Sequence, residues 1–216
     1  MIPTSIDGTD ITGATIDGTD VTEITVDGDV VFTAGFTIVD DFEDNNLSEW
    51  TNFGTGGGSI TTDAAEGSFA LKVVDGPNNG NFLRNWTVPS GRFELGCEFR
   101  WNNTGNFAVF GDFSNTSDNS TGSGFGLTFL TGELVIQTDS GNTQLVNNPN
   151  SNQYYNLKVL CDNTNAVIEQ VIVDGTTISI NEPMLSNNPV SNLIGVRADD
   201  VAGQEVYLDN ITVADL

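Results

Sequence analysis

Carboxylates are almost the only side chains in this chain that could perform chemistry. Its 216 residues include 30 Asp and Glu, six Lys and Arg, two Cys and no His. A mechanism in which His activates a nucleophile is therefore excluded, and zinc is disfavoured because its protein ligands are mainly His and Cys. The chemistry that remains is cleavage by paired carboxyl groups, calcium binding through oxygen, or recognition of sugar hydroxyls.

Paired carboxyl groups are expected to lie too far apart for glycoside hydrolysis. A retaining glycosidase holds its two carboxyl groups about 5–5.5 Å apart, and an inverting one about 6.5–9.5 Å apart. The nearest pair on one face of an expected strand is Glu94 and Glu98, whose four-residue separation spans about 13 Å. We therefore expect that the protein is not an enzyme. Glycan degradation is the last of three candidate functions, and the other two are binding functions.

A polar row on the same strand is the candidate for sugar binding. Residues 93–101 alternate apolar and polar side chains, which places the two kinds on opposite faces of a strand. The polar residues opposite the core face are Arg92, Glu94, Glu98 and Arg100. They are predicted to bind carbohydrate by presenting hydrogen-bonding groups to glycan hydroxyls, with pairing to nearby charges as the alternative. The aromatic residues that either stack on sugars or fill the core are Trp50, Trp86, Trp101, Tyr154 and Tyr155.

These residues belong to a long series of runs that predicts an all-β protein. The runs occupy 36–39, 68–74, 93–101, 107–113, 125–130, 133–138, 155–161, 166–173, 193–196 and 206–213. Clusters of Gly, Asn, Asp and Pro separate them, which favours many short antiparallel strands. About 180 residues suit a jelly roll better than a seven-stranded immunoglobulin domain of about 100. We therefore predict an antiparallel jelly-roll β-sandwich over residues 35–216.

A ten-residue repeat precedes the sandwich. Its units place Asp7-Gly8, Asp17-Gly18 and Asp27-Gly28 among β-branched residues, which is the strongest short-range signal for a hairpin turn. Hairpins this small cannot bury an apolar face of their own and need a neighbour. Residues 1–34 are therefore predicted to form a small N-terminal β-hairpin arm that anchors and oligomerises the protein, with a trimer favoured.

The net charge of −24 excludes whole classes of partner. Only Lys72 and Lys158 are lysines, so no basic patch exists to neutralise the phosphates of a nucleic acid. No segment reaches the roughly 18 apolar residues of a membrane span. Abundant acid with almost no lysine indicates adaptation to molar salt, where a screening length of about 3 Å removes the self-repulsion. A secreted acidic calcium-binding protein is the alternative.

The two cysteines leave two alternatives open. Cys97 shares strand parity with Phe99, and Cys161 shares it with Val159, so both are expected to point into a core. They are either free buried thiols or the two halves of a disulfide, and the sequence does not place their Cα atoms within bonding distance.

Three segments resemble concanavalin A-like and laminin G-like jelly rolls. They are Asp40-Asp41-Phe42-Glu43-Asp44 with the following Leu47-Ser48-Glu49-Trp50, then residues 66–73, then residues 206–213. In related jelly rolls an acidic residue of the opening strand and one of the closing strand hold a structural ion. By that resemblance Asp41, Glu43 and Asp209 are the candidate Ca²⁺ ligands, with backbone carbonyls near Ser68 and Lys72.

The decapeptide repeat is similar to N-terminal segments of tail-fibre and other structural proteins of tailed viruses, especially those of halophilic archaea. This resemblance implies a protein of the virion surface, in a tail fibre, a baseplate or a capsid turret or decoration. The arm would contact other virion proteins, and the jelly roll would bind host-surface glycans for attachment. The alternative is a carbohydrate-binding module of a secreted halophilic protein. Both expectations place the protein outside the cell, with no nucleic-acid partner and no membrane insertion.

Overall fold

A computed structural model of the chain describes most of the sandwich. The described residues are 36–54, 56–74, 80–102, 108–111, 124–130, 132–185, 193–198 and 204–216, with six short strand segments between residues 5 and 33. Every regular element among them is a β-strand. None of the described residues forms a helix long and apolar enough to cross a membrane. The prediction of an all-β protein is confirmed.

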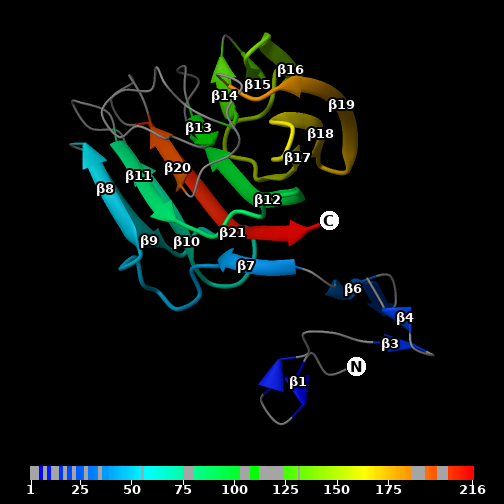
Figure 1. Ribbon diagram of the computed structural model, residues 1–216. Coiled ribbons are helices and arrows are strands. Elements are labelled where there is room, and N and C mark those ends of the chain that lie inside the picture. The colour runs from blue at the N-terminus through cyan, green and yellow to red at the C-terminus, as the bar shows by residue number, and fades with distance from the viewer. Residues whose placement is uncertain are drawn as a thin grey trace.

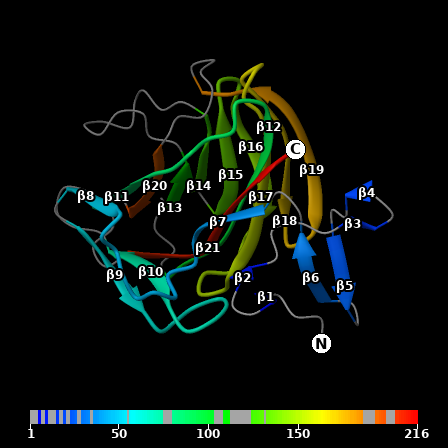
Figure 2. The same cartoon turned by 60° about the horizontal axis from the view of Figure 1, so that its bottom comes forward.

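Two antiparallel sheets form the two layers of the sandwich (Figures 1 and 2). The seven-stranded sheet has the order β16 (Gly141–Asn147), β15 (Glu133–Thr138), β14 (Gly126–Leu130), β13 (Ala108–Gly111), β20 (Leu193–Ala198), β11 (Gly80–Asn85) and β8 (Trp50–Gly54). The eight-stranded sheet has the order β19 (Thr176–Pro183), β18 (Val167–Val173), β17 (Tyr155–Asp162), β12 (Arg92–Trp101), β21 (Glu205–Asp215), β10 (Ala70–Val74) and β9 (Gly57–Thr61). Its eighth strand, β7 (Phe36–Asp40), pairs with the second half of β21, and β10 pairs with the first half. The predicted antiparallel jelly-roll sandwich is confirmed.

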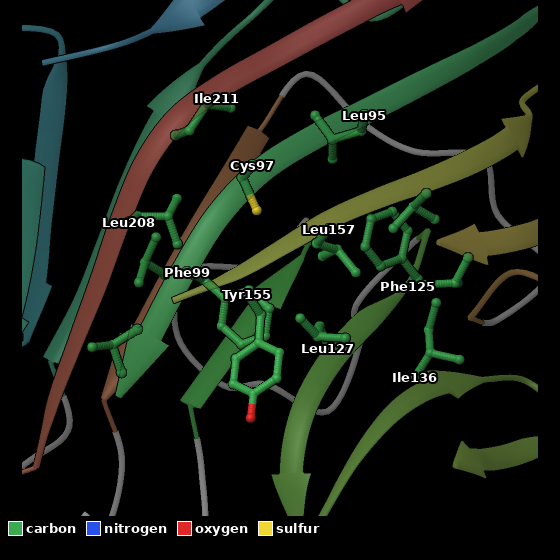
Figure 3. Packing of buried hydrophobic residues seen from close by; sticks show 14 of the residues in the cluster. Leu95, Cys97, Phe99, Phe125, Leu127, Ile136, Tyr155, Leu157, Leu208 and Ile211 are labelled. Carbon is green, nitrogen blue, oxygen red and sulfur yellow. The ribbon is translucent and has the colours of Figure 1, made fainter. Parts of the chain in front are cut away.

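The hydrophobic core fills the space between the two sheets. Along β12 the apolar side chains are buried and the polar ones alternate with them on the other face. Figure 3 shows Cys97 and Phe99 of β12 and Leu157 of β17 pointing into the cluster that contains Leu127 of the opposite sheet. Burial of these side chains, at roughly 25 cal/mol per Å² of apolar surface, is the main force that holds the sheets together.

Five strands have no counterpart among the predicted runs: β8, β9, β11, β16 and β19. Four of them are the outermost strands of their sheets, where only one side is paired and the sequence is rich in Gly, Asn, Ser and Thr. Gly58 of β9 lay in a cluster expected to be a turn. Glycine is needed there for close packing instead, because a Cβ would lie 2.7 Å from the ring of Phe82.

The N-terminal repeat forms three separate hairpins, drawn in blue in Figure 1. They are β1 (Ser5–Ile6) with β2 (Thr9–Asp10), β3 (Thr15–Ile16) with β4 (Thr19–Asp20), and β5 (Glu23–Val26) with β6 (Asp29–Thr33). Each pairing leaves two residues between its strands, and these Asp-Gly pairs lie outside the described residues. Within the described segments, none of the six strands pairs with either large sheet. Anchoring and oligomerisation by the arm stay predictions.

Asp40 connects the two sheets near the start of the sandwich. Its Oδ2 atom accepts a hydrogen bond from Trp50 Nε1 at 2.7 Å and forms an ion pair with Arg84. Asp40 ends a strand of the eight-stranded sheet, whereas Trp50 and Arg84 belong to the seven-stranded sheet. Both charged side chains are largely buried, and Arg84 also pairs with Glu49, so loss of Arg84 would leave the Asp40 carboxylate buried without its ionic partner.

Both cysteines are free and buried. Cys161 of β17 is in register with Phe93, and Cys97 is in register with Leu157, four residues farther along β12. Four residues of strand span about 13 Å, which exceeds the limit of about 7 Å between the Cα atoms of a disulfide. The disulfide alternative is therefore wrong and the free-thiol alternative is confirmed. Burial raises the pKa of both thiols, which disfavours the reactive thiolate.

A water-soluble thiol reagent is expected to label neither Cys97 nor Cys161 in the folded chain at neutral pH, because both side chains are buried and protonated. In denaturant both cysteines should react at once. The absorbance of the released leaving group measures both states. Rapid labelling of either cysteine without denaturant would contradict the placement of β12 and β17.

Candidate functional site

The polar row of β12 lies on the outward face of the eight-stranded sheet, as the alternation predicts. Three of its four members are held by ion pairs with neighbouring elements: β18, β17, and loop 62–69, which connects β9 to β10. The pairs are Arg92–Glu169 (2.6 Å), Glu94–Lys158 (2.9 Å) and Arg100–Asp63 (2.5 Å). The structure therefore brings the four residues onto one face, but compensates three of their charges within the chain.

Arg100 holds loop 62–69 against the sheet. Its guanidinium carbon lies 3.9 Å from the ring centroid of Tyr207 and 5.1 Å from that of Tyr154. The hydroxyl of Tyr154 donates to the backbone carbonyl of Asp63 at 2.7 Å, next to the Arg100–Asp63 ion pair. Only 11% of the Arg100 side chain is exposed, so it stabilises the loop rather than presenting a free cation to a ligand.

The aromatic candidates offer little surface for stacking on a sugar. Trp50, Trp86, Trp101 and Tyr155 are buried members of the core cluster. Tyr154 is partly buried, and Arg100 lies over its ring. Their alternative role as core residues is therefore the one that the structure supports for the first four.

A hollow of about 190 Å³ opens on the outward face beside Glu98. Gly96 lies in its wall, where a Cβ would lie 2.5 Å from Thr212 Oγ1, so only glycine allows the Thr212 side chain to pack against β12 here. The polar residues that line the hollow are Glu66, Glu98, Asn156, Lys158, Asn210 and Thr212. They come from loop 62–69, β12, β17 and β21, and they bring carboxylate, amide, amine and hydroxyl groups around one small volume.

Glu98 is the member of the polar row that takes part in none of the ion pairs between described residues. Its Oε1 atom accepts a hydrogen bond from Asn156 Nδ2 at 3.1 Å, whereas its Oε2 atom is shielded from solvent and accepts none. Burial raises the pKa of Glu98 and the charges of Glu66 and Asp209 raise it further, against the lowering effects of the Asn156 and Asn210 side chains. A carboxyl group that has an oxygen without a hydrogen bond, has a raised pKa and lies beside a hollow is typical of a binding site.

Glu43 and Asp209, two of the three predicted calcium ligands, contact the same loop 62–69. Only 1% of Asp209 is exposed, and burial raises its pKa, with a further increase from the charge of Glu43. The loop presents four backbone N–H groups to the two carboxylates. These are Ala65 and Glu66 to Asp209 Oδ2 at 2.9 and 3.0 Å, and Ser68 and Phe69 to Glu43 Oε1 at 2.8 and 2.9 Å.

The third predicted ligand, Asp41, instead accepts a hydrogen bond from the N–H group of Glu43 at 3.2 Å. Throughout the part of the chain that the structure describes, no three Asp, Glu or Cys side chains are grouped so that they could hold a metal ion. Two carboxylates that face N–H donors supply fewer oxygens than the six to eight that Ca²⁺ takes, so the side chains alone do not complete a calcium shell. Calcium binding stays a prediction, and no later step depends on it.

The sequence prediction missed most of the residues that line the hollow. Asn156 and Lys158 are outward positions of β17, in register with Glu98 and Gly96 of β12. The alternation of β17 signals their outward face, but nothing local in the sequence states which residue of β12 each one meets. Glu66 comes from a loop without periodicity, so no pattern could have placed it there.

Comparison with solved structures identifies the fold. A sialidase structure shares 17% identity at a TM-score of 0.59, over 84% of this chain and 18% of that chain. The cellulose-induced protein Cip1 shares 18% identity at a TM-score of 0.59, over 82% of this chain and 96% of that chain. A structure of botulinum neurotoxin type C, whose cell entry depends on two ganglioside molecules, shares 12% identity at a TM-score of 0.53, over 77% and 43%.

These likenesses show the β-sandwich fold and no more, because all three identities are low. Neither a protein-family model nor a curated protein matches the sequence. The chain spans less than a fifth of the sialidase structure and less than half of the neurotoxin structure, although it covers almost all of Cip1. The activity of a whole sialidase or toxin therefore does not transfer with the fold.

Replacement Glu98→Gln should raise the melting temperature by about 2 °C at neutral pH, a typical effect of about 1 kcal/mol in a domain of this size. Folding raises the pKa of Glu98, so folding favours its protonated form. The stability contributed by Glu98 is therefore complete below its pKa in the unfolded chain, near 4, and is lost as the pH rises through its pKa in the folded chain. The amide carries no charge, so the difference between the two proteins should vanish near pH 4. Calorimetry from pH 4 to 8 measures it.

Glu94→Gln is the matched control for this prediction, because Glu94 lies on the same face of the same strand but is paired with Lys158. It should leave the melting temperature unchanged or lower it slightly. A lower melting temperature for Glu98→Gln at neutral pH would show that the Glu98 carboxylate is well solvated, against the burial described above.

Proposed function

We propose that the sandwich is a glycan-binding domain whose binding site is the hollow between loop 62–69, β12 and β17. The observation that supports this proposal is the convergence of Glu98, Asn156, Asn210 and Thr212 beside the small residue Gly96. Carboxylates accept, amides both accept and donate, and hydroxyls do both, which is the mixture that sugar hydroxyls require. The volume of about 190 Å³ suits a single sugar residue of a longer chain rather than a large ligand.

The printed descriptions of the similar structures support binding of glycans as a class. One neurotoxin structure concerns dependence on two ganglioside molecules, and another contains a neurotoxin binding domain in complex with SialylT. They are supporting analogies, since the same fold serves many functions. In this chain the argument depends on the hollow and its polar lining.

We further propose that the domain belongs to the surface of a halophilic virus, with the N-terminal hairpins as its arm. Multivalent display on a homo-oligomer, a trimer in the favoured case, would amplify weak contacts to a host glycan. The repeat supports an arm because, among the described segments, each hairpin pairs only within itself, so a neighbouring protein could pair with its strand edges. The alternative is a carbohydrate-binding module of a secreted halophilic protein, which predicts a monomer.

The distribution of charge supports a saline environment. Each of the five basic side chains whose placement is described lies in an ion pair: Lys72–Glu205, Arg84–Asp40, Arg92–Glu169, Arg100–Asp63 and Lys158–Glu94. The other acids exceed these partners by far, since the net charge is −24. Such a surface repels itself at low ionic strength and is screened in molar salt.

Hydrolysis is the second candidate function, because the raised pKa of Glu98 beside Asp209 would suit a general acid. The surroundings of Asp209 argue against it. Its Oδ1 atom accepts the N–H of Asn210 at 2.9 Å and its Oδ2 atom accepts two further N–H groups, while 1% of the residue is exposed. A carboxylate enclosed in this way cannot reach a sugar carbon, so we propose binding without catalysis.

Asn156→Ala should weaken saccharide binding at least fivefold, because it removes an amide that lines the hollow and orients Glu98. Calorimetric titration with defined neutral, amino and acidic oligosaccharides, in dilute and in molar salt, measures the affinity. The saccharides should be recovered intact. Asn142→Ala, an exposed change on the opposite sheet, should leave binding unaltered. Equal affinity of both variants, or no saccharide bound by the wild type, would refute the proposed site.

Removal of residues 1–34 should convert an oligomer into a monomer that retains the melting transition of the sandwich, because the two large sheets contain none of the six arm strands among the described residues. Light scattering of both proteins in molar salt gives their masses. Two monomers of the expected masses would favour the secreted binding module over the virion arm.

A further inference from the structure

The sign of the charge in the hollow indicates which sugars can enter it, if the proposed function is correct. Three carboxylates lie in or under it: Glu66 and Glu98 in the lining, and Asp209 directly across the strand pair from Glu98. Burial is the main cause of the raised pKa of Glu98, and the charges of Glu66 and Asp209 raise it further. A ligand placed here therefore meets a negative potential at short range.

The only cation in the described lining, Lys158, does not balance these charges. Its Nζ atom is 2.9 Å from Glu94 Oε1, so the charge of Lys158 is already compensated. Glu94 lies four residues before Glu98 on β12. Glu66 and Glu98 accept hydrogen bonds from neutral amides, at 3.2 Å from Asn210 and 3.1 Å from Asn156. Among the ion pairs of the described residues, neither of these two carboxylates has a partner.

Glu98 adds a second, independent indication. Its Oε2 atom is enclosed by protein and accepts no hydrogen bond, which is costly for a charged oxygen. Gly96 adds no side chain of its own to the adjacent wall, where the hydroxyl of Thr212 lies instead. A donor group that enters beside Gly96 can relieve this deficit after a small movement of the carboxylate, whereas another acceptor would increase it.

We propose that the hollow selects a sugar residue bearing a free, positively charged amine, and that it rejects sugars bearing a carboxylate. An ammonium group supplies three donors and the opposite charge to Glu66 and Glu98. An N-acetylated amine supplies a single donor and no charge. A uronic or sialic acid would bring a further negative charge next to three carboxylates.

The probes are glucosamine oligosaccharides, their N-acetylated counterparts of equal length and uronic acid oligosaccharides, titrated into the full chain below the pKa of the amine. The free amine should bind about tenfold more tightly than the N-acetylated form, and the acidic sugar should bind weakest. The preference for the amine should shrink as salt increases, because screening weakens the charge interaction.

Glu66→Gln and Glu98→Gln should each weaken binding of the free amine severalfold more than binding of the N-acetylated form, so that the preference for the amine falls. Glu133→Gln, which removes the same charge from the opposite sheet, is the matched control and should preserve the preference. Far-ultraviolet circular dichroism of each variant confirms that it is folded.

The outcomes separate this inference from the proposed function. Equal or tighter binding of the N-acetylated or acidic sugars, still weakened by Asn156→Ala, overturns the selection of an amine and leaves the binding site in place. A preference for the amine that Glu133→Gln reduces as much as Glu98→Gln reflects the charge of the whole protein and also overturns it. Failure of every saccharide to bind overturns both proposals.

Discussion

The structure depends on the central position of β12, which is hydrogen-bonded along its length by β17 on one side and by β21 on the other. A strand that is hydrogen-bonded on both sides cannot rotate about its axis, so its alternate side chains are fixed on opposite faces of the sheet. One face gives Phe93, Leu95, Cys97, Phe99 and Trp101 to the core. The other face gives the polar row and the opening at Gly96. A shift of one residue in this register would exchange the two faces and remove both the core and the hollow.

Alternation is also why part of the site could be predicted from the sequence. It placed Arg92, Glu94, Glu98 and Arg100 on the face opposite the core, and it placed both cysteines inside. It could not state which residues of β17 and β21 lie beside them, because the register between strands is set by contacts distant in the sequence. For the same reason the sequence allowed ion pairing of this row as an alternative but could not name the partners, and it could not distinguish the roles of Arg100 and Glu98.

Four of the five strands that the sequence failed to indicate have a common physical origin. β8, β9, β16 and β19 lie at the edges of their sheets, where one face or one side meets solvent and no strict pattern is required. Their sequences are rich in Gly, Asn and Thr, which ordinarily signal turns. Gly58 illustrates the ambiguity, because the residue type that suggested a turn is required for close packing against Phe82.

Loop 62–69 links the core to the proposed function. Its backbone N–H groups satisfy Asp209 and Glu43, its Asp63 pairs with Arg100, and its Glu66 enters the lining of the hollow. The buried carboxylate of Asp209 and the exposed carboxylate of Glu43 accept these N–H groups and hold the loop against the outward face of the eight-stranded sheet, where it forms one wall of the site. In the proposed account, the carboxylates of Glu66 and Glu98, which have no ion-pair partner among the described residues, select among ligands by charge.

A crystal structure of the full chain with its tightest-binding oligosaccharide tests the central claim most directly, because it locates the ligand without reference to any variant. The account predicts electron density for one sugar residue in the hollow, in hydrogen-bonding contact with Asn156 and Glu98 and bordered by Gly96. Density on the seven-stranded sheet, or on the outward face away from loop 62–69, would contradict it.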